Sequence, residues 1–254
     1  MPASFIAAQL YTLREHLKTP TDIASSLVKV RQLGYEAVQV SGLGPIEPAQ
    51  LKDAADQAGV RIIATHIGFE RIRNEPQAVI ADHQLWACRH VAIGGLPTEY
   101  RNEEGFHRFA LEASAAARPL VEAGLTCSYH DHSFELERFG GRTALEILYA
   151  ESDPQVFSAE IDTYWIQHGG GNPVSWLHRL KGRCHLVHLK DMAMKGSQQL
   201  YAEVGEGNLE WPAILAACRE AGVEWYIVEQ DTCQRDPFES LGISLINLRR
   251  LGLQ

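Results

Sequence analysis

Short runs of β-branched, apolar or aromatic residues recur along the whole chain at a nearly constant spacing. Eight runs begin at Phe5, Ala37, Arg61, His90, Thr126, Phe157, Cys184 and Trp225. Successive starts lie about 31 residues apart, which is the length of a strand, a helix and two loops in a βαβ unit. No linker rich in proline or serine interrupts this rhythm. The repetition predicts that strands and helices alternate through all 254 residues.

The segments between these runs carry the signals of helix ends. Asn102 stands before two glutamates and predicts a capped helix start, and Asn172-Pro173 and Asp236-Pro237 predict two more. Four of the helical patterns are followed by a glycine, which is typical of a helix end: Gly34, Gly59, Gly124 and Gly222. The sequence therefore predicts a repeating β/α chain.

Eight such units predict a single (β/α)8 TIM barrel over residues 1–254, because a closed barrel leaves no strand edge to protect. An open, doubly wound parallel sheet is the structural alternative. A dinucleotide site is disfavoured in either case. Ser41–Pro45 follows a predicted strand but lacks the third glycine of that motif and has a proline where the helix should begin.

Charge and cysteine content exclude several classes of protein. The chain has 23 basic and 32 acidic residues, so its net charge of −9 gives it no attraction for nucleic acid or an anionic membrane. Its five cysteines form no CxxC pair, which predicts reduced thiols in a cytoplasmic protein. The apolar run Phe5–Leu10 is too short for a signal peptide or a membrane span. We expect a small molecule as partner, and whether the chain forms a homo-oligomer stays open.

Ionisable residues end five of the predicted strands, and in a TIM barrel the reactive side chains cluster at the carboxyl ends of the strands. The five segments are Ala64–His66, Tyr129–His132, Glu160–Asp162, His188–Asp191 and Val228–Asp231. Alternate residues of a strand share a face, which pairs His130 with His132, Glu160 with Asp162, and His188 with Lys190. We expect these faces to point into the barrel.

Four of these residues form a candidate metal site: His130, Asp162, His188 and Glu229. Two imidazoles and two carboxylates suit Mn²⁺, Zn²⁺, Co²⁺ or Fe²⁺, and Mg²⁺ is also open. Any one of them could be a solvated loop entry, but four such groups buried without a cation would leave costly unpaired charge. Both histidines must be neutral to bind a metal, so we expect metal affinity to weaken as the pH falls toward about 6.

At these residues the sequence resembles the xylose-isomerase-like TIM-barrel superfamily, specifically its sugar phosphate isomerase/epimerase group. The matching segments are Tyr129–Glu135, Glu160–Trp165, His188–Asp191, Val204–Gly207 and Val228–Asp231, with Gln9–Tyr11 and Thr65-His66 in the first half. The resemblance implies one divalent metal held by Glu, Asp, His and Glu at the ends of strands five to eight. Asp162, His188 and Glu229 match three of these ligands, and His130 stands where the first Glu would be.

The resemblance implies a metal-dependent isomerase or epimerase of a sugar or related polyhydroxy carbonyl compound, which removes a proton beside a metal-bound carbonyl. Ketose 3-epimerases of the superfamily use two metal-bound glutamates, whereas here only Glu229 is in place. The Tyr-His-Xaa-His segment at Tyr129 is also similar to enzymes that act on keto-sugars by elimination or hydration. A lyase or dehydratase acting on a keto-sugar or keto-inositol is therefore the alternative, and a non-catalytic sugar-binding barrel is a third.

Individual roles follow from the position of each residue. Glu229 is the expected base, with His132 and Lys190 as further catalytic groups. Four residues are expected to bind the substrate: His66, Lys190, Glu135 and Trp165. An alternative reading of Lys190 is a solvated lysine at a strand end.

Several neighbouring residues and loops are expected to support the site without binding the metal. Tyr11 offers an aromatic wall, Glu160 is expected to orient a ligand, and His185 has the opposite parity to His188 and is interpreted as structural. We interpret Gly169–Pro173 as a flexible loop and not a phosphate cradle, because it lacks the lysine and hydroxyl of a P-loop. Val204–Asn208 is a candidate lid.

Overall fold

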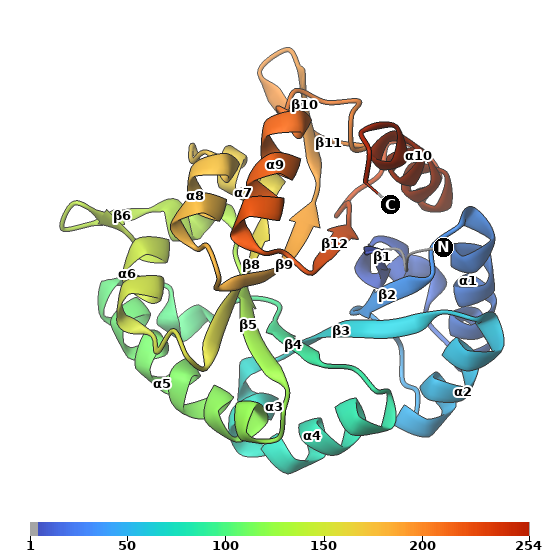
Figure 1. The fold of residues 1–254 in the computed structure, drawn as a ribbon, viewed down its shortest axis with the longest axis horizontal. Coiled ribbons are helices and arrows are strands. Elements are labelled where there is room, and N and C mark those ends of the chain that lie inside the picture. Colours follow the sequence, from blue (N-terminus) through green and yellow to red (C-terminus); the bar gives the residue numbers. More distant parts are fainter. Residues whose placement is uncertain (1–4, 254) are drawn as a thin grey trace.

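The computed structural model describes residues 5–253, which form a closed barrel of eight parallel strands (Figure 1). The barrel strands are β1 (Ile6–Gln9), β2 (Ala37–Val40), β3 (Arg61–Ile67), β4 (His90–Ile93), β5 (Thr126–His130), β8 (Phe157–Asp162), β9 (Cys184–Leu189) and β12 (Trp225–Val228). Seven begin at the predicted residue, and β1 begins one residue later, at Ile6. The eight-run pattern therefore located every barrel strand.

The first and last barrel strands pair with each other and close the sheet. Ala8 of β1 is in register with Val228 of β12 on one side and with Val38 of β2 on the other. All eight neighbouring pairs are parallel. This confirms the predicted (β/α)8 TIM barrel and excludes the open sheet.

Helices surround the barrel (Figure 1). They are α1 (Pro20–Leu33), α2 (Pro48–Ala58), α3 (Phe69–Asn74), α4 (Pro76–Leu85), α5 (Glu103–Glu122), α6 (Ala144–Glu151), α7 (Thr163–His168), α8 (Pro173–Arg179), α9 (Trp211–Ala221) and α10 (Pro237–Arg250). Three 3-10 helices add to them: η1 (Leu10–His16), η2 (Thr98–Tyr100) and η3 (Ser133–Leu136). The predicted caps are confirmed, since Asn102, Asn172 and Asp236 each accept a hydrogen bond from the first turn of α5, α8 and α10.

Two hairpins that the sequence did not predict extend the loops at the carboxyl ends of the strands. One joins β6 (Arg138–Phe139) to β7 (Arg142–Thr143), and the other joins β10 (Asp191–Lys195) to β11 (Gln198–Ala202). The second hairpin begins at Asp191, which is also the last residue of the His188–Asp191 segment.

The interior of the barrel has an apolar layer beneath a polar one. A compact cluster of small and aliphatic side chains is separate from the main core: Ala7, Ala37, Ile63, Ala64, Leu186 and Ile227. Ala7, Ala37 and Leu186 each stand two positions before a buried polar residue of the same strand, namely Gln9, Gln39 and His188, and Ile227 stands two positions before Glu229, the residue that follows β12. Because alternate residues share a face, the polar side chains lie above this layer at the carboxyl ends of the strands.

Two sequence predictions concern the whole chain. No cysteine among the described residues forms a disulfide, and four of the five are buried, as expected of reduced thiols. Among residues 5–253, no helix combines the length and the apolar character that a membrane crossing requires.

Candidate metal centre

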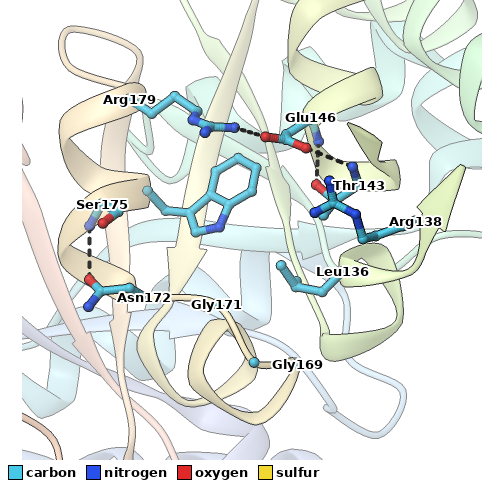
Figure 2. Close-up of a pocket in the computed structure, with 11 residues that line it drawn as sticks. Leu136, Arg138, Thr143, Glu146, Gly169, Gly171, Asn172, Ser175 and Arg179 are labelled. Atoms are coloured by element: carbon cyan, nitrogen blue, oxygen red, sulfur yellow. Dashed lines mark hydrogen bonds and ion pairs between the residues drawn. The ribbon is translucent and has the colours of Figure 1, made fainter. Parts of the chain in front are cut away.

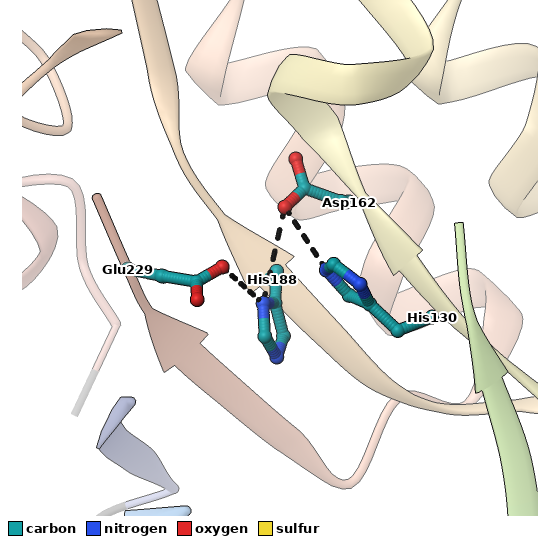
Figure 3. A group of neighbouring side chains, drawn as sticks. All are labelled: His130, Asp162, His188 and Glu229. Carbon is teal, nitrogen blue, oxygen red and sulfur yellow. Dashed lines mark hydrogen bonds and ion pairs between the residues drawn. The ribbon is translucent and has the colours of Figure 1, made fainter. Parts of the chain in front are cut away.

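The four side chains expected to bind metal meet at the carboxyl end of the barrel (Figure 3). Asp162 Oδ2 lies 3.3 Å from His130 Nε2 and 3.8 Å from His188 Nδ1. Glu229 Oε2 lies 2.8 Å from His188 Nδ1. All four candidate ligand atoms lie within 4.8 Å of one another, and all four residues are buried.

This donor set fits a divalent ion. Nitrogen and oxygen ligands lie about 2.0–2.2 Å from a bound Zn²⁺, so in a tetrahedral site they lie about 3–4 Å from one another. The three contacts above, at 2.8–3.8 Å, fall close to this range. Two buried carboxylates also supply the negative charge that a buried cation requires. His130, Asp162, His188 and Glu229 are therefore the residues that could hold the ion.

Gln39 fixes the orientation of the His188 ring. Its Oε1 lies 2.6 Å from His188 Nε2 and also accepts a hydrogen bond from Gln9 Nε2, so His188 Nε2 carries a proton toward it. Gln39 Nε2 in turn donates to Glu160 Oε1 at 2.7 Å. With Nε2 protonated, the opposite nitrogen, Nδ1, has the lone pair for a metal. Gln39 was missed by the sequence analysis, although its place two residues after Ala37, as the only polar residue of its strand, is a usable signal.

His66 and Glu160 lie on the other side of the His188 ring. His66 Nε2 is 2.7 Å from Glu160 Oε2, and Glu160 Oε1 is 3.4 Å from His188 Nε2. These three residues form a second cluster that could hold an ion. However, His188 Nε2 is already donating to Gln39, so we interpret this cluster as a support for the ring of His188. That is the role expected of Glu160.

The pKa values of the metal-free site show how strongly its charges interact. Burial lowers the pKa of His188, but the charges of Glu160 and Glu229 outweigh this and raise it to about 10. Burial also lowers the pKa of His130, and the nearby His188 lowers it further. Without an ion, the proton on His188 partly neutralises the carboxylates. Binding of an ion through Nδ1 must displace that proton.

Lys190 lies among the carboxylates of the site, although the sequence analysis expected it to bind substrate. Its side chain is fully buried. Its Nζ lies 3.0 Å from Asp162 Oδ2, 2.7 Å from Glu229 Oε2 and 2.6 Å from Asp231 Oδ2. The contact with Asp231 is a hydrogen bond, and those with Asp162 and Glu229 are close ion pairs. The alternative reading of Lys190 as a solvated lysine at a strand end is therefore wrong, and its contact with a substrate stays a prediction.

A small polar cavity opens beside the four candidate ligands. Its volume is about 190 Å³, and it is lined by Tyr11, Ser41, His66, Gly94, His130, His132, Glu229 and Asp231. His66, His132 and Tyr11 were expected near the substrate. Asp231 was missed as a site residue, although it shares strand parity with Glu229.

The cavity gives the two oxygens of Glu229 different surroundings. Glu229 Oε2 contacts His188 and Lys190, whereas Oε1 has no hydrogen-bond partner among the described residues. Because Glu229 also lines the cavity, Oε1 is the oxygen available to a bound molecule.

His132 and Trp165 leave polar nitrogens without partners. His132 Nδ1 and Trp165 Nε1 are both buried and form no hydrogen bond within the described chain. The two rings lie 5.4 Å apart between centroids, but only His132 lines the cavity. Burial lowers the pKa of His132 to about 3, so its ring is neutral near pH 7. Buried polar atoms of this kind are ordinarily satisfied by water or a ligand.

Glu135 is not at the cavity, contrary to the sequence analysis. It is fully buried, and its Oε1 accepts a hydrogen bond from the Tyr129 hydroxyl. Its Oε2 accepts one from the backbone N–H of His132 at 2.9 Å. Burial raises the pKa of this carboxyl to about 8. Glu135 therefore holds the loop that carries His132 and does not line the cavity.

Two further buried carboxyls support the site from behind. Asp131 Oδ1 accepts a hydrogen bond from the backbone N–H of Asp162, and burial raises the pKa of Asp131 well above its usual range. Asp191 accepts hydrogen bonds from the backbone N–H groups of Gly205 and Gly207 and from the indole of Trp211. The expected lid, Val204–Asn208, is thus tied to Asp191, the first residue of β10.

The glycine stretch before α8 has no free backbone donors. The N–H groups of Gly169, Gly170 and Gly171 donate to carbonyls of α7 at 2.9–3.0 Å. They line a separate cavity of about 310 Å³ beside Arg138 and Arg179, and the Arg179 guanidinium is paired with Glu146 (Figure 2). The structure therefore supports the prediction that this stretch is not a phosphate cradle.

His185 lies near the amino end of β9, away from the candidate ligands. Its Nδ1 is 3.0 Å from Glu224 Oε1, just before β12 begins. This position agrees with the structural role expected from its parity.

Comparison with known proteins identifies relatives of the same fold. No protein-family model matches the chain. Inosose dehydratase from Geobacillus kaustophilus is 25% identical over 289 aligned positions, which cover 93% of this chain and 88% of that protein. A sugar phosphate isomerase/epimerase from Parabacteroides distasonis has a solved structure with a TM-score of 0.81 and 22% identity, covering 97% of this chain and 94% of the other. A xylose isomerase domain protein from Alicyclobacillus acidocaldarius gives a TM-score of 0.69 at 14% identity, covering 98% of both chains.

The predicted resemblance is thus confirmed at the level of the fold: the chain is a TIM barrel, similar in fold to the sugar phosphate isomerase/epimerase and to the xylose isomerase domain protein just described.

Proposed function

We propose that this protein is a divalent-metal-dependent enzyme that removes a proton from the carbon beside a carbonyl group in a small, neutral polyhydroxy compound. Isomerisation or epimerisation follows if the proton is returned to a carbon. The observation that carries this proposal is the position of Glu229, which belongs to the four-ligand cluster and also lines the adjoining cavity.

The chain supplies a base at a defined atom. Glu229 Oε2 is held by His188 and Lys190, and these contacts keep the pKa of Glu229 well below its usual range despite burial. The carboxylate is therefore ionised, with Oε1 directed at no protein donor. An ion held by the four ligands would act as a Lewis acid that polarises the carbonyl and stabilises the negative charge formed on its oxygen. Glu229 Oε1 accepts the proton, and His66 and His132 line the same cavity and offer nitrogens to substrate hydroxyls.

The cavity favours a neutral substrate the size of one sugar ring. Its volume of about 190 Å³ is smaller than the roughly 300–1,000 Å³ of sites for drug-sized ligands. Among the described residues, the cavity lining includes no arginine or lysine, which are the usual partners of a phosphate group. A sugar without a phosphate group fits this lining better than a sugar phosphate.

Elimination of water is the second candidate, and two observations favour it. Of the two positions at which ketose 3-epimerases carry glutamates, only Glu229 is a glutamate here, and His130 occupies the other. One base is sufficient to begin an elimination, whereas epimerisation requires proton transfer on both faces of the carbon. The likeness to an inosose dehydratase points in the same direction. A keto-inositol is therefore a substrate to test beside the keto-sugars.

Deuterium exchange tests the shared first step. The protein is loaded with Mn²⁺, Co²⁺ or Zn²⁺ and incubated with keto-sugars and inososes in deuterated water, and NMR reports exchange at carbon. Isomerisation keeps every carbon and oxygen atom of the substrate, whereas elimination releases water and leaves an absorbing unsaturated ketone. Glu229→Gln is expected to slow exchange by about 10²–10⁴-fold, the usual contribution of a general base.

Glu224→Gln is the matched control, because Glu224 lies at the amino end of the barrel and should leave exchange unchanged. Metal content is measured for each variant by elemental analysis, because Glu229 is also a candidate ligand. Full turnover by Glu229→Gln would contradict the proposal, and so would a wild-type protein that binds none of the three ions.

A further inference from the structure

Lys190 contacts the same oxygen atoms that the candidate metal site would use. Its Nζ lies 3.0 Å from Asp162 Oδ2 and 2.7 Å from Glu229 Oε2. These two oxygens also make the contacts with His130 Nε2 and His188 Nδ1 that define the four-ligand cluster. A bound ion and the ammonium group would therefore share two carboxylate oxygens.

The surroundings of Lys190 hold its charge in this position. The side chain is fully buried, and its Nζ lies over the rings of Trp165 and Tyr201 at 5.4 and 5.8 Å from their centroids. Aromatic faces attract cations. The backbone is also fixed, because the N–H of Lys190 donates to the Thr163 hydroxyl and its carbonyl accepts from the same hydroxyl. The ammonium cannot move far from the site without losing these contacts.

Lys190 contacts three carboxylates, and that of Asp231 is the one outside the four-ligand cluster. Its Oδ2 makes the shortest of the three contacts, at 2.6 Å from Lys190 Nζ. Its side chain is 25% exposed at the cavity, while those of Asp162 and Glu229 are almost fully buried. Asp231 thus offers the ammonium a partner on the cavity side that is not a candidate ligand.

We propose that Lys190 is a positioning residue that sets the affinity of the site for a divalent ion, by competing with the ion for Asp162 and Glu229, and that Asp231 limits this competition. The inference rests on the metal site of the proposed function. Two cations a few ångströms apart in a buried site repel strongly, so the lysine weakens ion binding. In the metal-free protein the same lysine is the counter-ion that keeps three close carboxylates together.

Direct Mn²⁺ binding to the purified, metal-stripped protein tests the inference. Lys190→Met is expected to lower the dissociation constant for Mn²⁺ by about tenfold or more, because a buried positive charge is removed. Asp231→Asn is expected to raise it, because Lys190 then pairs only with the candidate ligands. Since Asp231→Asn also removes a negative charge directly, the double variant is needed. The effect of Asp231→Asn should be smaller when Lys190 is absent.

Thermal unfolding gives a second readout that does not depend on activity. Metal-free Lys190→Met should unfold at a lower temperature than wild type, and Mn²⁺ should raise its midpoint by more than it raises that of wild type. Lys181→Met is the control, since Lys181 is exposed in the turn after α8 and should change neither readout. If Lys190→Met does not fold even with Mn²⁺, the Mn²⁺ affinities of Lys190→Gln and Asp231→Asn are compared with that of wild type instead.

The outcomes separate this inference from the function on which it rests. If wild type binds Mn²⁺ and both Lys190 variants bind it with an unchanged or weaker affinity, the inference is overturned and the proposed function stands. If Asp231→Asn binds Mn²⁺ as tightly as wild type, the role of Asp231 is overturned. If wild type and Lys190→Met both bind no Mn²⁺, Co²⁺ or Zn²⁺, the metal site itself is wrong.

Discussion

The two ends of the barrel both bring histidines and glutamate together, in different surroundings. At the amino end, Glu224 contacts His185, His90 and Arg89 at 3.0–3.6 Å, and its side chain is 36% exposed. At the carboxyl end, the carboxylates of Glu160, Asp162, Glu229 and Asp231 converge, and the first three are almost fully buried.

The two ends differ in how many carboxylates they bring together and in how deeply these are buried. A single half-exposed carboxylate is balanced by one arginine and by water, and such a pair contributes little to stability. Four converging carboxylates are not balanced by Lys190 and a protonated His188 alone. The number and burial of the carboxylates, rather than the presence of histidine, identify the carboxyl end as the candidate site.

Removing one histidine from each end should give the largest contrast. His188→Ala is expected to abolish ion binding and to lower the free energy of unfolding by about 3–5 kcal/mol, because buried carboxylates lose a partner. His185→Ala, at the half-exposed end of the same strand, should cost less than about 1 kcal/mol. Elemental analysis and urea denaturation measure both effects. Equal losses in the two variants would break the comparison between the ends.

Adding a methyl group to one glycine at each end separates close packing from backbone strain. A Cβ on Gly207 would lie 2.3 Å from Asp191 Oδ1, whereas nothing lies within 4 Å of one on Gly222, whose φ is +84°. Gly207→Ala should lower the free energy of unfolding by about 3 kcal/mol through overpacking. Gly222→Ala should cost only about 1–2 kcal/mol, for its left-handed backbone. Denaturation curves that reverse this order would contradict the role of Asp191 as a fixed anchor.

The two ends should respond to pH with opposite signs in the metal-free protein. Burial, opposed by Glu224, lowers the pKa of His90 to about 4, so the unfolded chain takes up a proton before the folded one and stability falls as the pH drops from about 6.5 to 4. The pKa of His188 is raised to about 10, so its contribution is fully present below pH 6.5 and is lost as the pH rises toward 10.

Denaturation across this pH range, for wild type, His90→Gln and His188→Gln, checks both signs. His90→Gln should reduce only the loss of stability between pH 6.5 and 4. His188→Gln should reduce only the loss of stability as the pH rises toward 10. Ion affinity should also rise with pH well above 6.5, because the ion displaces the His188 proton. Calorimetry in buffers of different ionisation enthalpy measures that proton release, and its absence at pH 8 would contradict ligation by His188.

The smallest effect is expected in the loop between α4 and β4, which leads into the amino end. Ala87 has a φ of +51° and is the one residue other than glycine with a positive φ among the described residues. Ala87→Gly should raise the free energy of unfolding by about 0.5–1 kcal/mol, because glycine adopts this conformation without strain. Ion affinity should not change. A stability unchanged or lowered in thermal unfolding would show that the strain is offset by contacts of the Ala87 methyl group.

Much of the candidate site could be predicted because it depends on local patterns. The strand runs are short and regular, and a parallel barrel brings all carboxyl ends to one face. His130, Asp162, His188 and Glu229 each lie at such an end with inward parity, so their convergence follows from the topology. Strand alternation likewise placed His185 away from the site.

Contacts across the barrel could not be predicted in the same way. Gln39 and His188 are 149 positions apart, and their hydrogen bond depends on the register of the closed sheet. Glu135 belongs to a segment that resembles the family, yet its local 3-10 turn directs it to Tyr129 and not to the cavity. Lys190 shares the face of His188 as predicted, but its partners come from β8 and from the segment after β12.

The sequence by itself determined the alternation of strands and helices, the barrel and the four residues that could hold an ion, because these depend on periodicity, helix caps and strand parity. Only the tertiary structure decided which oxygen of Glu229 is free, that Lys190 is buried between three carboxylates, and that Val204–Asn208 is tied to Asp191. The physical reason is that hydrogen bonds and ion pairs act over about 3 Å. Residues far apart in the chain come that close only when the barrel is closed.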